Sequence, residues 1–102
     1  MKESDFQNKL INKIKKRFPG AIVLKNDASY VQGIPDLTVF YKVHWCCLEC
    51  KKSAKASENN DNYNQIYYVN LMNMMSYATF VYPENEEEVL DEMGRLFEVS
   101  KK

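Results

Sequence analysis

The chain has 102 residues, of which 45% are hydrophobic and 27% are charged. This composition is typical of a globular protein rather than a disordered one, and the length suits one domain spanning residues 1–102. No apolar run approaches the roughly 18–20 residues that a membrane span requires, and the polar N-terminus lacks the apolar core of a signal peptide. The three cysteines fall within residues 46–50, too close together for a disulfide framework. We therefore expect a cytoplasmic protein without membrane association.

The net charge of zero conceals two oppositely charged halves. Residues 1–55 hold eleven Lys and Arg residues against five Asp and Glu residues, whereas residues 56–102 hold three against nine. A basic half suits a polyanionic partner such as nucleic acid, and an acidic half repels one. Because such divisions also occur on ordinary solvated surfaces, the charge pattern alone leaves both interpretations open.

The first predicted element is an amphipathic helix over residues 2–18, which ends at Pro19-Gly20. Its apolar stripe consists of Phe6, Leu10, Ile11, Ile14 and Phe18. Glu3 and Gln7 fall on the same stripe, where polar side chains are unusual. An exposed first turn, in which an acid suits the helix dipole, would also explain Glu3.

Three strands are predicted next, over residues 21–25, 36–41 and 43–51, with a tight turn near Lys42 joining the last two. Residues 26–35 and 52–62 read as loops, residues 63–75 as a helix, residues 77–82 as a strand and residues 86–98 as a final helix. The order is α-β-β-β-α-β plus a C-terminal helix. This order predicts an α/β (α+β) fold with a small mixed sheet flanked by helices.

Asp36 and the run Glu49-Cys50-Lys51 carry the most informative pattern. Strand alternation puts Glu49 and Lys51 on one face, and an antiparallel hairpin would bring Asp36 close to Glu49. Two such carboxylates repel each other unless a proton or a cation intervenes. A hard divalent cation such as Mg²⁺ would bind well between these two carboxylates. Lys51 beside the carboxylates can contact a water molecule or a phosphate oxygen.

Pro35-Asp36 followed by Glu49-Cys50-Lys51 resembles the signature of the PD-(D/E)XK nucleases, and more narrowly that of the small stand-alone VRR-NUC nucleases typical of phages. The resemblance covers about residues 2–80. Further matches, in order, are Glu3 and Gln7, Lys25-Asn26, Gly33-Ile34-Pro35-Asp36-Leu37, and Gln65 at the start of the next helix. The resemblance implies a restriction-endonuclease-like core and, for a phage protein, the cytoplasm of a bacterial host.

The activity that the resemblance implies is metal-dependent hydrolysis of DNA phosphodiester bonds. Asp36, Glu49 and the backbone carbonyl of Cys50 would hold Mg²⁺ or Mn²⁺, and Glu3, turned inward, would complete the site. Lys51 would position the attacking water and stabilise the transition state, with Gln65 orienting phosphate or water. No small-molecule cofactor is expected.

The same resemblance suggests DNA as the partner, with a branched substrate such as a four-way junction or a flap as the specific expectation. Candidate DNA-binding residues are Gln7, Lys25, Tyr30, Lys52 and Lys55. Lysines meet backbone phosphates and a tyrosine can stack on a base. Lys52 and Lys55 also suit an ordinary solvated loop.

Three further interpretations remain. The Tyr- and Met-rich helix over residues 63–75 carries more apolar residues than one core contact needs, which suggests a homodimer interface. A zinc site built from His44, Cys46, Cys47 and Cys50 is disfavoured, because Cys47 points away from the other cysteines. A non-catalytic DNA-binding or scaffolding protein that kept the fold is the main functional alternative. The presence of Asp36, Glu49 and Lys51 together favours the enzyme.

Overall fold

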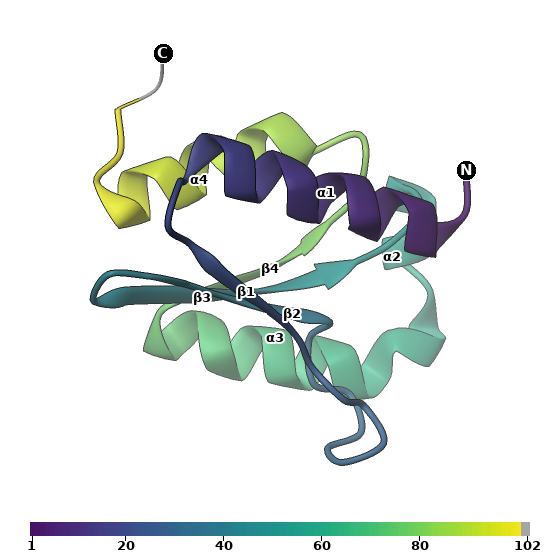
Figure 1. Cartoon of the computed structure of the whole chain (residues 1–102). Coiled ribbons are helices and arrows are strands. Elements are labelled where there is room, and N and C mark those ends of the chain that lie inside the picture. Colours follow the sequence, from purple (N-terminus) through teal and green to yellow (C-terminus); the bar gives the residue numbers. More distant parts are fainter. Residues whose placement is uncertain (101–102) are drawn as a thin grey trace.

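The computed structural model describes residues 1–100, apart from the Asn60 side chain, as one mixed sheet with helices on both faces (Figure 1). The elements in chain order are α1 (Glu3–Arg17), β1 (Ile22–Lys25), β2 (Leu37–Tyr41), β3 (His44–Cys50), α2 (Ala54–Ser57), the 3₁₀ helix η1 (Asn60–Asn62), α3 (Tyr63–Met75), β4 (Tyr77–Val81) and α4 (Glu86–Phe97). The predicted helices and strands are all confirmed, with ends that shift by at most one residue.

The strand order in the sheet is β1-β2-β3-β4. The pairs β1–β2 and β2–β3 are antiparallel, whereas β4 runs parallel to β3 and is reached through α3. The turn between β2 and β3 is tight, and Lys42 takes a left-handed backbone conformation in it with φ 56°. The small mixed sheet and the turn near Lys42 are therefore as the sequence predicts.

The prediction that residues 52–62 form a loop is wrong in part, because α2 and η1 interrupt this segment. The Ser53 hydroxyl accepts a hydrogen bond from the Ala56 backbone N–H at 3.1 Å and caps α2. The Asn59 side chain accepts one from the Asp61 backbone N–H at 2.9 Å and caps η1. Small polar residues favour loops on average, but at these two positions they start single helical turns.

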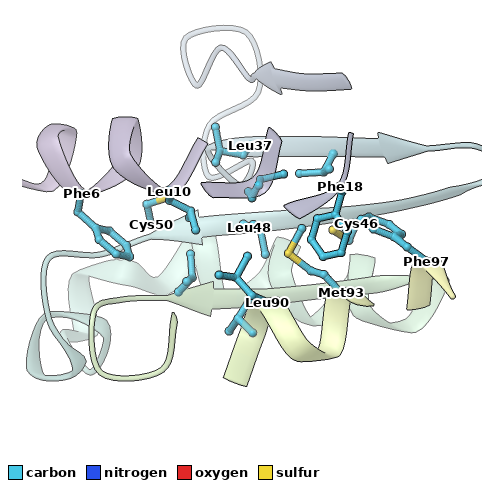
Figure 2. Packing of buried hydrophobic residues seen from close by; sticks show 14 residues of the cluster. Phe6, Leu10, Phe18, Leu37, Cys46, Leu48, Cys50, Leu90, Met93 and Phe97 are labelled. Carbon is cyan, nitrogen blue, oxygen red and sulfur yellow. The ribbon is translucent and has the colours of Figure 1, made fainter. Parts of the chain in front are cut away.

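The main hydrophobic core lies between the sheet and the helices α1 and α4 (Figure 2). Its buried residues include Phe6, Leu10 and Phe18 of α1, Leu37 of β2, Cys46, Leu48 and Cys50 of β3, and Leu90, Met93 and Phe97 of α4. A smaller cluster on the opposite face holds Cys47, Val69 and Ala78, against which Trp45, Met72 and Phe80 pack. The strand β3 is thus covered on both faces, with the alternation that the sequence predicts.

Among residues 1–100, no helix is both long enough and apolar enough to cross a membrane. In the view of Figure 1, α1 and α4 lie above the sheet and α3 lies below it, and the loop over residues 26–35 extends from the end of β1 on the α3 side. This loop returns the chain to the start of β2, directly ahead of Asp36. Its conformation therefore decides where Asp36 lies.

Gly33 fits this loop against α3, and replacing it tests the fit. Its φ is +93°, and an added Cβ would lie 2.5 Å from Asn64 Cβ and 2.8 Å from the Asn64 backbone carbonyl carbon. Gly20 is a matched control because its φ is +95° with open space around it. We expect Gly20→Ala to lower the free energy of unfolding by about 1 kcal/mol, and Gly33→Ala to lower it by about 1–3 kcal/mol more. Urea unfolding followed by circular dichroism measures both, and equal losses would contradict the close contact with Asn64.

Candidate active site

The carboxylates of Asp36 and Glu49 meet across the β2–β3 hairpin. Asp36 directly precedes β2, and the register that pairs Leu37 with Leu48 continues to place Asp36 opposite Glu49. The Asp36 backbone N–H donates to Glu49 Oε1 at 3.2 Å, and the Cys50 backbone N–H donates to Asp36 Oδ2 at 3.0 Å. Each carboxylate thus binds the backbone of the opposite strand, which holds the two acids side by side.

The chain ahead of Asp36 is fixed by Asn26. The Asn26 backbone N–H donates to the Asp36 carbonyl oxygen at 2.8 Å. Its side-chain amide donates to the Pro35 carbonyl oxygen at 2.9 Å and to Thr38 Oγ1 at 2.8 Å. These contacts of Asn26 were not predicted from the sequence. The sequence pattern that could have indicated them is an Asn directly after a strand and before a loop that ends in Gly-x-Pro. At such a position an amide side chain can supply the hydrogen bonds that the loop backbone lacks.

Lys51 follows Glu49 at the end of β3 and is largely buried. Its amine donates to Gln65 Oε1 of α3 at 2.7 Å and lies 3.4 Å from Glu49 Oε2. The structure thus brings Asp36, Glu49, Lys51 and Gln65 together, as predicted. The contact of Gln65 with the lysine itself was not predicted, and it fixes where the amine lies beside the carboxylates.

Both carboxylates have raised pKa values. Burial, followed by repulsion from Asp36, raises the pKa of Glu49 to about 7, despite the opposing effect of Lys51. Burial is also the main cause that raises the pKa of Asp36, with the charge of Glu3 adding to it and the Cys50 N–H opposing it. Lys51 therefore does not offset the cost of burying two negative charges. A second cation at the pair would relieve this cost.

Glu3 and Gln7 extend the site from α1 in different ways. Glu3 lies in the first turn of the helix and is exposed to solvent. The resemblance implies that this acid turns inward, so its position differs from that expectation. Its charge nevertheless acts on Asp36 and raises the pKa of that carboxyl. Gln7, one turn further along, is half-buried and hydrogen-bonds the Cys50 thiol. Gln7 therefore lies beside Cys50 and is partly shielded from solvent.

The donor atoms of this site suit a hard cation. Asp36 and Glu49 offer carboxylate oxygens, and the Cys50 carbonyl follows Glu49 on the same strand. Within residues 1–100, no three His, Cys, Asp or Glu side chains form a group that could hold a metal ion by themselves. Two carboxylates are nonetheless the usual protein contribution to a Mg²⁺ site, because Mg²⁺ keeps several waters and takes further oxygens from substrate phosphate. The residues present therefore fit Mg²⁺ or Mn²⁺.

The predicted DNA-binding residues other than Gln7 are exposed at the edge of the sheet where Asp36 lies. Lys25 ends β1 beside the start of β2, and its amine donates to Asn8 Oδ1 at 3.3 Å. Lys52 and Lys55 follow β3 and are exposed, and Tyr30 in the loop over residues 26–35 is 89% exposed. Three lysines and one tyrosine are thus available to a ligand at this edge.

The cysteines do not converge. Cys46 and Cys50 are buried in the core under α1 and α4, whereas Cys47 is buried on the face that α3 covers. All three carry free thiols, and burial raises the pKa of each. A thiolate zinc site would need these side chains on one face, so the geometry favours their role as small apolar core residues.

In comparisons with known proteins, this chain matches no family model, no curated protein and no solved structure. Its function is therefore inferred from its own residues and their geometry. The most specific feature of that geometry is the pair formed by the half-buried Asp36 and the buried Glu49, with Lys51 in contact with Glu49.

The raised pKa of Glu49 makes stability depend on pH. Between its ordinary value of 4.5 and about 7, the folded state keeps a proton that the unfolded state releases, so this group lowers stability as pH rises through that window. We expect Glu49→Gln to stabilise the metal-free protein at pH 8 by about 1–3 kcal/mol relative to its effect at pH 4.5. Urea unfolding in EDTA at both pH values measures this difference.

Glu87→Gln, at an exposed position in the first turn of α4, is the control for loss of one acid and should not stabilise the protein at pH 8 relative to pH 4.5, because an ionised acid there suits the helix dipole. A Glu49→Gln effect that is the same at pH 4.5 and pH 8 would contradict the raised pKa.

Proposed function

We propose that this chain is a divalent-metal-dependent deoxyribonuclease that hydrolyses phosphodiester bonds. The observation that carries the proposal is the cross-strand pairing of Asp36 with Glu49, beside the amine of Lys51. One buried acid and one half-buried acid beside a single lysine leave a net negative site once both acids are ionised. Such a site attracts a divalent cation, and a cation held there can in turn bind a phosphate.

Three observations support placing the chain among the PD-(D/E)XK nucleases, near the stand-alone VRR-NUC type. Apart from the single turns α2 and η1, the observed order is α-β-β-β-α-β with a C-terminal helix, which is the order expected of a restriction-endonuclease-like core. The proline, the two acids and the lysine of the motif meet at one edge of the sheet. Gln65 of α3 accepts a hydrogen bond from the lysine. The match rests on this combination, since each part alone is common.

Each side chain has a distinct part in the proposed reaction. Asp36 and Glu49 would hold Mg²⁺ or Mn²⁺, with the Cys50 carbonyl as a further oxygen and Glu3 close enough to add its charge. The bound cation would neutralise charge on the scissile phosphate and make water a better nucleophile. Lys51, held by Gln65, would orient the attacking water and donate to a phosphate oxygen as negative charge develops.

The substrate that we propose is DNA, with a branched form such as a four-way junction or a flap as the specific hypothesis. Lys25, Lys52 and Lys55 are exposed at the edge of the sheet that carries the acids, where they can contact backbone phosphates. Tyr30, on a loop at the same edge, offers its ring to an unpaired base. A branch point supplies unpaired bases next to duplex phosphates.

A cleavage assay tests this function. Labelled linear duplex, single strand, flap, fork and four-way junction DNA are incubated with Mg²⁺, Mn²⁺ or EDTA. We expect metal-dependent cleavage, which Asp36→Ala and Lys51→Ala each lower by at least about a hundredfold through loss of a cation ligand and of a positive charge at the phosphate.

Lys42→Ala, at the hairpin turn at the opposite end of β2, and Glu87→Gln on α4 are matched controls that should keep full activity. DNA binding without cleavage of any substrate would favour the non-catalytic DNA-binding protein instead. Cleavage that survives in both Asp36→Ala and Lys51→Ala would show that the site has been placed wrongly.

A further inference from the structure

A pocket of about 380 Å³ lies in the loop over residues 26–35, which joins β1 to β2 on the α3 side of the sheet (Figure 1). Its lining residues are Asn26, Asp27, Tyr30, Val31 and Ile34, and none of the proposed metal ligands is among them. This volume is at the lower end of the roughly 300–1,000 Å³ that is typical of ligand pockets. The pocket therefore suits a ligand of about the size of one nucleobase and its sugar.

Hydrogen bonds within the loop fix the shape of this pocket. The Asp27 carbonyl oxygen accepts from the backbone N–H groups of Tyr30 at 3.1 Å and Val31 at 3.4 Å. The Val31 carbonyl oxygen accepts from the Ile34 N–H at 3.2 Å. Asp27 Oδ1 also accepts from the Ser29 backbone N–H at 2.8 Å and from its hydroxyl at 2.6 Å. A pocket that is already formed loses little conformational freedom when a ligand binds.

The lining offers flat and apolar surface together with hydrogen-bond acceptors. Val31 and Ile34 are half-buried, whereas the Tyr30 ring is exposed and free to stack on an aromatic ligand. The Asn26 amide nitrogen already donates two hydrogen bonds within the protein. The group that Asn26 can offer to a ligand is therefore its side-chain carbonyl oxygen.

Asp27 adds a charged acceptor to this lining. Its Oδ1 atom binds Ser29, and these hydrogen bonds lower the pKa of the carboxyl, so that Asp27 is ionised at neutral pH. Within residues 1–100, Asp27 Oδ2 has no hydrogen-bond partner, and no Lys or Arg lines the pocket. A phosphate group would be repelled here, whereas a flat aromatic ligand with N–H donors would be bound.

The two ends of the loop place this pocket beside the candidate active site. Lys25 precedes the loop and Asp36 follows it. The Asn26 N–H donates to the Asp36 carbonyl oxygen at 2.8 Å, which brings the two ends together. A nucleotide with its phosphate at Lys25 or at a cation on Asp36 would therefore have its base within reach of the loop.

We propose that this pocket binds an unpaired nucleobase of the substrate and prefers guanine. The inference rests on the proposed binding of DNA but not on cleavage. Guanine carries an N1–H and a 2-amino group side by side, and these donors match the oxygens that Asp27 and Asn26 offer. Thymine offers a single N–H between two carbonyl oxygens, which a carboxylate repels. In a duplex this edge of the base is occupied by its partner, so the pocket selects unpaired strands.

Competition binding to single-stranded DNA of about 12 nucleotides tests the pocket. EDTA prevents metal-dependent cleavage, and a lithium buffer disfavours guanine quadruplexes. The probes are a strand of thymidines, a strand of alternating deoxyguanosine and thymidine, and a strand with deoxyinosine in place of deoxyguanosine. We expect the guanine strand to bind at least about tenfold more tightly than the thymidine strand, because hydrogen bonds to a charged acceptor are strong. The inosine strand, which lacks the 2-amino group, should lie between them.

Asp27→Asn should lower the preference for guanine to less than about twofold, because it replaces the free carboxylate oxygen with an N–H₂ donor. The Asn side chain keeps one oxygen that can accept from Ser29, so the loop conformation is retained. Glu87→Gln on α4 removes the same charge in the opposite layer and should keep the full preference. Circular dichroism confirms that both variants are folded.

The comparison of the three strands on the wild type decides the question even where Asp27→Asn disturbs the loop. Equal binding of the guanine and thymidine strands, no binding of any strand, or a preference that survives in Asp27→Asn would each overturn the inference. Metal-dependent cleavage without a base preference would overturn the pocket and leave the nuclease standing. A base preference without cleavage would support the pocket in a non-catalytic DNA-binding protein.

Discussion

The arrangement of this site depends on two hydrogen bonds across the β2–β3 hairpin, which hold the carboxylates of Asp36 and Glu49 side by side. The Glu49 carboxylate accepts a hydrogen bond from the Asp36 backbone N–H, and the Asp36 carboxylate accepts one from the Cys50 backbone N–H. The register of β2 against β3 therefore sets the positions of the two acids. A shift of one residue in this register would place Glu49 on the opposite face of the sheet. The register is secured because β3 is packed on both faces, under α1 and α4 on one side and under α3 on the other.

Burial raises the pKa values of both carboxylates in this arrangement. Glu49 is almost completely buried, and its pKa rises to about 7 because burial and the neighbouring Asp36 both disfavour its charged form. The single Lys51 does not compensate for this acid together with the half-buried Asp36, and its amine is also directed toward Gln65. The fold thus maintains a local excess of negative charge at an edge of the sheet where Lys25 and Lys52 are exposed. A divalent cation followed by a phosphate group would restore electrical balance there.

Much of this could be predicted from the sequence, because alternation in strands is a local property. The pairing of Asp36 with Glu49 followed from the tight turn at Lys42 and the spacing of the two acids. The contacts made by Asn26 and Gln65 could not be predicted, because they depend on how a loop and a distant helix pack in three dimensions. Glu3 shows the limit of a periodicity argument: it lies on the apolar stripe of α1, yet the helix begins there and leaves it in solvent.

The measurement that tests the central claim most directly is the effect of Mg²⁺ and Mn²⁺ on thermal unfolding at pH 8. If the two carboxylates require a cation, millimolar metal will raise the unfolding temperature of the wild type, since a ligand that binds only the folded state stabilises it. The rise should vanish in Asp36→Asn and become smaller at pH 5, where Glu49 holds a proton. A wild type that shows no rise with either metal, or an equal rise in Asp36→Asn, would contradict the account.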